Sequence, residues 1–266
     1  MCIRDRGDII GKQGVELSYE KYLRGEKGIK FIQKDRFNRD IGSYNNGLND
    51  KNSIAGNDLI ITIDSELQEY GELLMSNKKG AIVAIEPSTG ELLSLVSAPS
   101  YNPNLLVGRE RSKNYFELYK DSIYKPLIDK GLLSTFPAGS PFKVIVGLIA
   151  LQENVINDKN TIFCGGEYIY GRNKKSMKCH CGGGYRNIYN AISESCNSYF
   201  ADAYRKTISK DNNISKNFDM WSEGVKSFGL GNYLNNDLPI GKKGMIPTSE
   251  FYDRWYPDFR WGPTTN

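Results

Sequence analysis

A serine and a lysine three residues apart, Ser140 and Lys143, form the pattern with the clearest chemistry in this chain. Residues at this spacing lie on one face of a helix, about one turn apart. A buried lysine loses part of its proton affinity and can then act as a base. A serine hydroxyl becomes a strong nucleophile only when such a base takes its proton. At a helix start, the helix dipole also favours the developing alkoxide.

The spacing alone is weak evidence, because three other pairs share it: Ser18/Lys21, Ser76/Lys79 and Ser122/Lys125. Context separates Ser140 from these serines. Pro137 and Gly139 predict a tight loop before it. Residues 144–151 are apolar throughout, which predicts a central, buried helix. The other lysines lie in polar segments that we expect to be solvated. The structural alternative for Ser140 is a residue that only caps the helix.

A second group of reactive residue types lies in a glycine-rich stretch. Cys164 is followed, after fourteen residues, by Cys179, His180 and Cys181. Three thiols and one imidazole could form a tetrahedral Zn²⁺ site. Adjacent side chains of an extended backbone point apart, so three of these residues with a fourth ligand from elsewhere form the alternative site. A disulfide or free thiols also stay open, and an oxidising compartment would permit the disulfide.

The hydrophobic pattern predicts elements that would position these residues. Residues 58–63 are expected to form a strand, and Asp64 to cap a helix that runs to about Met75. Residues 81–85 and 92–96 flank a Pro-Ser-Thr-Gly turn and predict a hairpin. Both arms are apolar on both faces, so we expect this hairpin inside a sheet covered by helices.

Two helices are expected on either side of this region, over residues 15–23 and over 188 to about 206. The polar stretch 38–57 reads as turns or a linker, which places a domain boundary near residue 55. Residues 1–6 are unlike the rest of the chain and are interpreted as a non-native leader. We expect both ends of the chain to be cut.

The composition is that of an ordinary globular protein, with 39% hydrophobic and 25% charged residues among 266. The formal charge of +4 is spread along the chain without a basic stripe, which argues against nucleic-acid binding. No apolar run reaches the roughly 18 residues that span a bilayer.

Together these segments resemble the penicillin-binding transpeptidases, the serine enzymes that cross-link peptidoglycan, and among them the elongation-type branch known as penicillin-binding protein 2. The matching segments lie in the family's order: Gly14-Val15-Glu16, Leu23-Arg24-Gly25, Leu59-Ile60-Ile61-Thr62-Ile63-Asp64, Gly80-Ala81-Ile82-Val83-Ala84, Pro87-Ser88-Thr89-Gly90, Ala98-Pro99-Ser100-Tyr101-Asn102-Pro103 and Pro137-Ala138-Gly139-Ser140-Pro141-Phe142-Lys143. The resemblance implies an α/β fold with an antiparallel sheet between helical layers. It makes residues 7–55 the end of an N-terminal pedestal and 56–266 a transpeptidase domain that is incomplete at its C-terminus.

The family's second motif, Ser-x-Asn, matches in the expected setting at Ser195-Cys196-Asn197. Four more matches lie elsewhere, at Ser43/Asn45, Ser100/Asn102, Ser112/Asn114 and Ser215/Asn217. By resemblance, Ser195 relays a proton near Lys143, and Asn197 holds that lysine and binds the substrate amide. The alternative is two polar residues at a helix start. Cys196 is expected to be a packed small residue. The third motif, Lys-Ser/Thr-Gly, does not occur in the chain.

The resemblance implies acyl transfer in two steps. Ser140 would attack the bond between the terminal D-alanines of a stem peptide, and an amine of a neighbouring stem would resolve the acyl-enzyme. The implied partners are D-Ala-D-Ala stem peptides, β-lactams and a membrane glycan polymerase. The implied location is the periplasmic face of the inner membrane, on an anchor outside this chain. The backbone N–H of Ser140 would be one oxyanion donor.

Some elongation-type members carry a zinc near the nucleophile, in an insertion that corresponds to the cysteine-rich stretch. The sequence also allows three other functions: a β-lactam sensor, a serine β-lactamase and an inactive scaffold of the cell-wall synthesis complex. The pedestal-like segment 14–25 argues against the sensor, and no deacylating machinery is identifiable.

Overall fold

The computed structural model describes residues 10–171, 173–234, 236–238, 240–257 and 261–262. The leader expected at residues 1–6 lies outside them. The chain divides into two compact units, Met1–Ser134 with Asn235–Lys242, and Thr135–Leu234 with Lys243–Asn266. No helix of the described residues is both long and apolar enough to cross a membrane.

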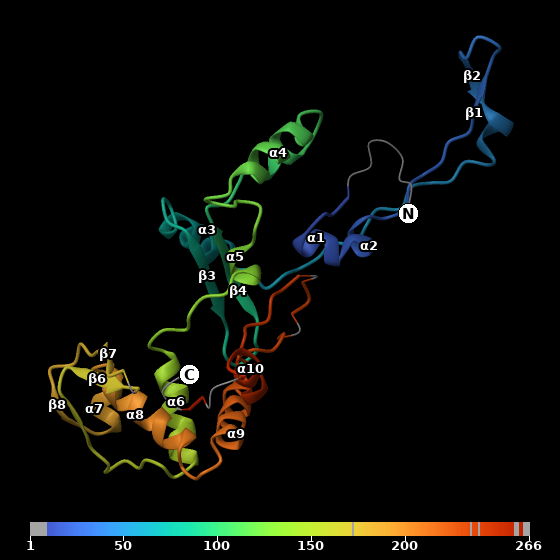
Figure 1. The fold of residues 1–266 in the computed structure, drawn as a ribbon. Coiled ribbons are helices and arrows are strands. Elements are labelled where there is room, and N and C mark those ends of the chain that lie inside the picture. The colour runs from blue at the N-terminus through green and yellow to red at the C-terminus, as the bar shows by residue number, and fades with distance from the viewer. Residues whose placement is uncertain (1–9, 172, 235, 239, 258–260, 263–266) are drawn as a thin grey trace. The chain divides into compact units, whose positions relative to one another are not determined.

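The first unit combines short helices with two antiparallel strand pairs, β1–β2 and β3–β4 (Figure 1). Its elements are α1 (Gly14–Ser18), α2 (Glu20–Leu23), β1 (Ile32–Lys34), β2 (Asp40–Ser43), η1 (Tyr44–Gly47), α3 (Ser65–Leu74), β3 (Gly80–Ile85), β4 (Leu92–Ala98), η2 (Pro103–Leu106), α4 (Arg111–Lys120) and α5 (Lys130–Leu133). The predicted helix at residues 15–23 is interrupted at Tyr19, whose backbone angles are not helical.

The helix and hairpin predicted for this unit are confirmed. Asp64 caps α3 and accepts a hydrogen bond from the Leu67 N–H at 3.0 Å. β3 and β4 pair over the length of the hairpin. Within the described residues this sheet has only two strands, and Val83 and Ile85 are exposed. Helix α3 packs against one face at Val96, and the short helix α5 packs against the other near Leu95 and Val83, so the expected helical cover is present in part.

The strand predicted at residues 58–63 is wrong. Residues 58–63 pair with no strand of the described residues; Thr62 Oγ1 donates to Leu92 O, and just after the segment Asp64 N donates to Leu93 O. A strand needs a repeating ladder of backbone bonds. High β propensity alone thus did not make this segment a strand.

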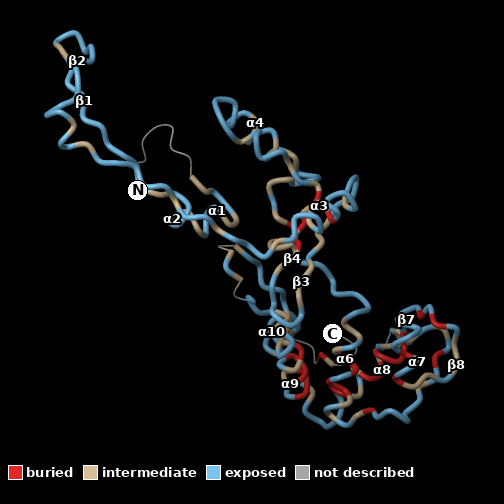
Figure 2. Tube along the Cα trace, turned by 180° about the vertical axis from the view of Figure 1, so that it is seen from behind, coloured by how far each residue is buried: buried red, intermediate tan, exposed pale blue. Residues whose placement is uncertain are grey.

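The second unit places three main helices around two hydrophobic clusters. Its elements are α6 (Phe142–Gln152), β5 (Ile162–Cys164), β6 (Glu167–Tyr170), β7 (Lys175–Lys178), β8 (Gly184–Arg186), α7 (Ile188–Ser193), α8 (Asn197–Ile208), α9 (Ile214–Lys226) and α10 (Ser249–Trp255). β5 pairs with β8 and β6 with β7, both antiparallel. Most buried residues of the described chain lie in this unit, along α6 to α9 (Figure 2).

Helix α6 contributes to both clusters. Val146 and Ala150 pack with α8 and the cysteine-rich stretch, whereas Ile149 packs with α9 and Trp261. A Cβ at Gly147 would lie 3.2 Å from Phe200 Cε1, so this glycine allows α6 and α8 to approach closely. Full burial of an aliphatic side chain such as Val146 or Ile149 contributes about 1.5–3 kcal/mol to the free energy of folding.

The expectation that this helix is buried all round needs correction. Val144 and Leu148 remain 47% and 46% exposed. They are four residues apart and so form one stripe of the helix. The described residues cover the opposite stripe only.

Candidate active site

Ser140 lies in the turn that leads into α6, two residues before its first helical residue. Gly139 has φ of +66°, a left-handed conformation that glycine adopts without steric cost. The Phe142 N–H then donates to Gly139 O at 3.1 Å, and the Lys143 N–H to Ser140 O at 3.0 Å. This turn leaves Ser140 exposed at the start of the helix, where a substrate could reach it.

The amine of Lys143 connects the two predicted motifs. Its Nζ donates to Ser140 Oγ at 3.2 Å, to Ser195 Oγ at 2.8 Å and to Ser195 O at 2.7 Å. An ammonium group has three N–H donors, and these three oxygens occupy all of them. Ser195 Oγ also donates to Ser140 Oγ at 3.0 Å. The three side chains therefore form one closed hydrogen-bonded group.

Ser195 interrupts the helix that the sequence predicted over 188–206. Its φ of +53° is left-handed and separates α7 from α8. Such a conformation costs a residue other than glycine about 1–2 kcal/mol. In return, the break turns both the hydroxyl and the carbonyl of Ser195 toward Lys143. The sequence offered no signal for it, since serine has no special preference for this conformation.

Asn197 is the first residue of α8 and is held at two points. Its side-chain Nδ2 donates to Lys178 O at 2.8 Å, and its backbone N–H donates to Cys179 Sγ at 3.1 Å. The predicted contact with Lys143 is not among the hydrogen bonds of the described residues. Asn197 and Lys143 do line one cavity of about 390 Å³, whose walls include the aromatic rings of Phe200 and Trp221.

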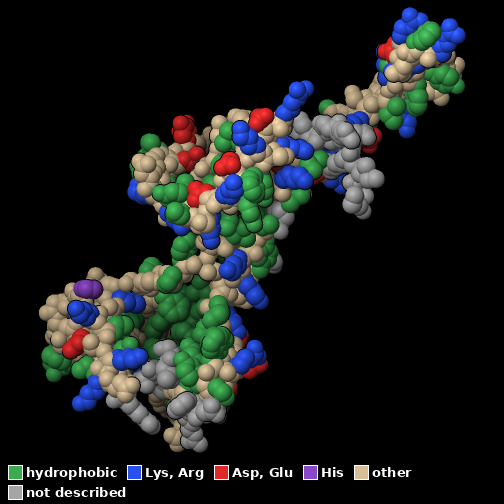
Figure 3. Space-filling view, turned by 45° about the horizontal axis from the view of Figure 1, so that its top comes forward, with side chains coloured by type: hydrophobic (Ala, Val, Ile, Leu, Met, Phe, Trp, Pro, Cys, Tyr) green, Lys and Arg blue, Asp and Glu red, His purple; other side chains and the backbone are tan. Residues whose placement is uncertain are grey.

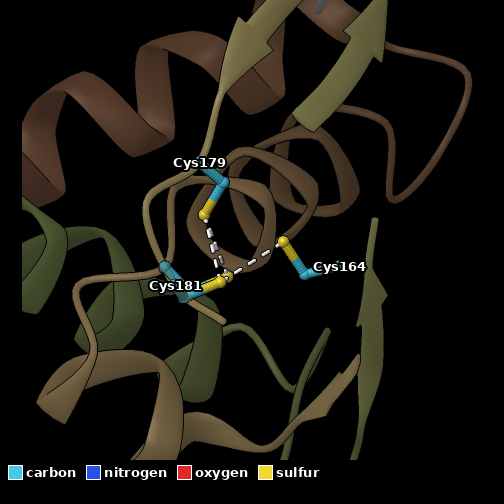
Figure 4. A group of neighbouring side chains, drawn as sticks. Cys164, Cys179 and Cys181 are labelled. Atoms are coloured by element: carbon cyan, nitrogen blue, oxygen red, sulfur yellow. Dashed lines mark hydrogen bonds between the residues drawn. The ribbon is translucent and has the colours of Figure 1, made fainter. Parts of the chain in front are cut away.

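Four cysteines gather beside this motif. Cys164, Cys179, Cys181 and Cys196 are buried, are not disulfide-bonded, and have all sulfur atoms within 4.8 Å of one another. Figure 4 shows the first three of them with their sulfur atoms turned toward one another. The closest Sγ–Sγ pairs are Cys179–Cys181 at 3.2 Å, Cys164–Cys181 at 3.3 Å, Cys181–Cys196 at 3.4 Å and Cys179–Cys196 at 3.6 Å. We call these residues the cysteine cluster.

The cluster differs from the four-residue ligand set at His180 and agrees with the alternative of three of these residues and a fourth ligand from elsewhere. His180 is exposed and lies outside the cluster, and the chain's one histidine is seen at the surface in Figure 3. It stands between Cys179 and Cys181, whose side chains both point inward, so alternation turns the imidazole outward. Cys196 takes the fourth place, whereas the sequence indicated a packing role only. Its position within the second motif was the available signal.

The cysteine cluster is suited to a metal. In a tetrahedral ZnS₄ site with Zn–S bonds of about 2.3 Å, the sulfur atoms lie about 3.8 Å apart. The four closest sulfur separations here, 3.2–3.6 Å, are shorter than this value, and all sulfur atoms lie within 4.8 Å of one another. Burial works against ionisation of Cys179, but backbone N–H donors of Cys181 and Ser198 and two neighbouring thiols lower its pKa to about 5. Burial raises the pKa values of Cys181 and Cys196.

Comparison with known proteins gives the family. Residues 80–262 match the penicillin-binding protein transpeptidase domain, and residues 4–61 match the penicillin-binding protein dimerisation domain. The peptidoglycan D,D-transpeptidase MrdA of Acinetobacter baumannii is 32% identical over 92% of this chain, and that of Escherichia coli K12 is 32% identical over 93%. The chain spans only 34% and 38% of these two relatives.

Solved structures agree. PBP2 of Pseudomonas aeruginosa, in complex with WCK 5153, is 31% identical, with a TM-score of 0.73 over 96% of this chain and 50% of its own. PBP2 of Helicobacter pylori, in complex with MreC, is 28% identical, with a TM-score of 0.73 over 96% of this chain and 45% of its own. From its matched domains, its relatives and its fold, the chain belongs to the penicillin-binding protein transpeptidase family.

Proposed function

We propose that this chain carries the nucleophile of a peptidoglycan D,D-transpeptidase of the elongation type, which cross-links stem peptides and supports cell shape. The observation that carries the proposal is the closed hydrogen-bonded group of Ser140, Lys143 and Ser195. It joins a nucleophile, a base and a second hydroxyl from two separate segments. The exposed hydroxyl of Ser140 is accessible to a substrate.

The geometry supports a route for the proton. Ser140 Oγ accepts from both Lys143 and Ser195. With Lys143 as the base, the Ser140 proton can pass to its Nζ directly or through the Ser195 hydroxyl. Ser140 Oγ then attacks the carbonyl between the terminal D-alanines, and the proton passes to the departing D-alanine. An amine of a second stem peptide attacks the resulting ester, its proton passes through Lys143 to Ser140 Oγ, and the C–Oγ bond breaks to leave the amide cross-link and free Ser140.

We assign the backbone N–H of Ser140 as one oxyanion donor. Among the described residues it has no acceptor. Donors preorganised toward a developing negative charge supply a large share of the catalysis of acyl transfer. Asn197 would bind the amide of the stem peptide from the start of α8.

We further propose residues 7–55 as the end of the pedestal and 56–266 as transpeptidase domain, with the family's antiparallel sheet between helical layers. The hairpin β3–β4 would contribute two strands to that sheet. We also propose that the catalytic domain works in the periplasm on an inner-membrane anchor, beside a membrane glycan polymerase, as the resemblance to the family implies.

For the cysteine cluster we propose a structural Zn²⁺ bound by Cys164, Cys179, Cys181 and Cys196. The four buried sulfur atoms, all within 4.8 Å of one another, support this set. The ion would cross-link the cysteine-rich stretch to the start of α8. Elemental analysis of the purified protein tests it, with about one zinc per chain expected. Less than about 0.1 zinc per chain, or a disulfide found by mapping the intact thiols, would remove the proposal.

A fluorescent penicillin tests the enzymatic proposal. The protein that carries this sequence, at the full length of its relatives, should form a stable adduct that mass spectrometry places on Ser140. Ser140→Ala should form none, whereas Ser122→Ala, at one of the other Ser-x-x-Lys matches, should react normally. Rapid release of the adduct would favour a β-lactamase. Acylation without cross-linking of stem peptides would favour a β-lactam sensor. The absence of any adduct would favour an inactive scaffold.

A further inference from the structure

The cysteine cluster touches the second motif through one particular thiol. Cys179 Sγ accepts the backbone N–H of Asn197 at 3.1 Å. The preceding residue, Lys178, accepts the side-chain Nδ2 of Asn197 through its carbonyl at 2.8 Å. Lys178, the last residue of β7, and Cys179, which follows it, thus hold the side chain and the backbone of Asn197.

The other thiols of the cluster have different contacts. Cys164 bonds to Ser198 Oγ at 3.2 Å, and Cys196 accepts the Tyr199 N–H at 3.5 Å. Cys181 contacts the three other thiols of the cluster. Among the described residues, Cys179 is therefore the thiol with a direct bond to Asn197.

This bond has a physical reason. The first N–H groups of a helix have no partner within the helix and need an outside acceptor. Asn197 begins α8, and Cys179 supplies that acceptor. With the helix start and one amide hydrogen fixed, the second amide hydrogen and Oδ1 of Asn197 remain for a substrate amide.

We propose that Cys179 is a positioning residue that orients Asn197 toward the acylamino group of the substrate or penicillin. The inference rests on the proposed function of the site. It goes beyond a structural role for the cluster, because it assigns substrate selectivity to one thiol. Loss of that thiol should weaken recognition of the acylamino group more than attack by Ser140.

Two penicillins separate these effects. Benzylpenicillin has an acylamino side chain, whereas 6-aminopenicillanic acid has a free amine in its place. The acylation rate constants of both are measured on the protein at the full length of its relatives. The variants are Cys179→Ala, Asn197→Ala and their combination. Cys181→Ala is the matched control, since it removes a thiol of the same cluster that does not contact Asn197.

We expect Cys179→Ala to lower the ratio of the two rate constants, benzylpenicillin over 6-aminopenicillanic acid, about tenfold, the effect of one hydrogen bond. Asn197→Ala should lower it similarly, and the double variant should show no further loss. Cys181→Ala removes a proposed metal ligand and should slow both reactions, but it should lower the ratio less than Cys179→Ala does, because the acceptor for the Asn197 N–H remains. Cys179→Ser keeps an acceptor and should restore most of the ratio.

An unchanged ratio in Cys179→Ala overturns the inference, as does an equal fall of the ratio in Cys181→Ala. If Cys179→Ala does not fold, Cys179→Ser decides. A folded serine variant with a ratio as low as that of Asn197→Ala contradicts positioning by an acceptor at this place. A wild-type protein that neither penicillin acylates overturns the proposed function itself, which is a distinguishable result.

Discussion

At the scale of residues, the site depends on Lys143, whose three N–H groups donate to oxygens of Ser140 and Ser195. These two serines come from separate segments of the chain. A lysine of another Ser-x-x-Lys match, Lys21, is not surrounded in this way. Lys21, three residues after Ser18, is exposed. The pattern Ser-x-x-Lys is therefore informative only where folding brings in a partner such as Ser195.

Replacement of Lys143 by alanine should slow acylation by a fluorescent penicillin by about 10²–10⁴-fold, the usual contribution of a general base. Rates of adduct formation measure this. Lys21→Ala is the matched control and should react at the wild-type rate. Acylation of Lys143→Ala within tenfold of wild type would contradict the role of this lysine as base.

Substitutions at Ser195 should affect the acylation rate and the stability of the fold differently. Ser195→Gly removes the hydroxyl bonds to Lys143 and Ser140 but relieves the left-handed backbone. Ser195→Ala removes the same bonds and keeps the strain. We expect both variants to be acylated slowly, and the glycine variant to be more stable than the alanine variant by about 1 kcal/mol. Urea unfolding measures the difference, and equal stabilities would argue against backbone strain at Ser195.

At the scale of elements, local signals predicted much of the fold. Asp64 before an apolar periodic segment indicated the start of α3, and the Pro-Ser-Thr-Gly turn indicated the β3–β4 hairpin. Both depend on neighbours in sequence. The break at Ser195 and the inclusion of Cys196 in the cysteine cluster depend on contacts with distant segments, which a local pattern does not contain.

Because α6 and α8 approach closely at Gly147, the effect of a substitution there should grow with the size of the new side chain. Alanine there gains helix propensity of about 1 kcal/mol but places its Cβ 3.2 Å from Phe200 Cε1. We therefore expect Gly147→Ala to be nearly neutral. Gly147→Leu should destabilise the protein by about 1–3 kcal/mol, because overpacking pushes the two helices apart. It should also slow acylation, since α6 carries Lys143 and α8 carries Asn197.

Urea unfolding and penicillin acylation of the two Gly147 variants test this. Equal stability of the leucine and alanine variants would show that α6 and α8 do not need the close contact. A leucine variant that loses stability but keeps the wild-type acylation rate would separate packing from the geometry of the site.

At the scale of the whole molecule, the cysteine cluster lies entirely in the second unit, within a hydrophobic cluster that includes Val146, Ala150 and Ile188. A metal that binds the folded state alone stabilises it in proportion to the logarithm of its free concentration over Kd. At a thousand times Kd this is about 4 kcal/mol. Removal of the metal should therefore loosen the segments that the cluster joins and leave the first unit as it was.

Hydrogen exchange followed by mass spectrometry can locate that effect. After chelation, amides of residues 162–208 should exchange up to about a thousandfold faster, whereas those of the β3–β4 hairpin should be unchanged. Cys181→Ser should reproduce the pattern without chelator, because it removes one ligand. If chelation changes neither segment, the cluster does not hold a stabilising metal. If both exchange faster together, the ion stabilises the chain as a whole, and the two compact units are one cooperative body in solution.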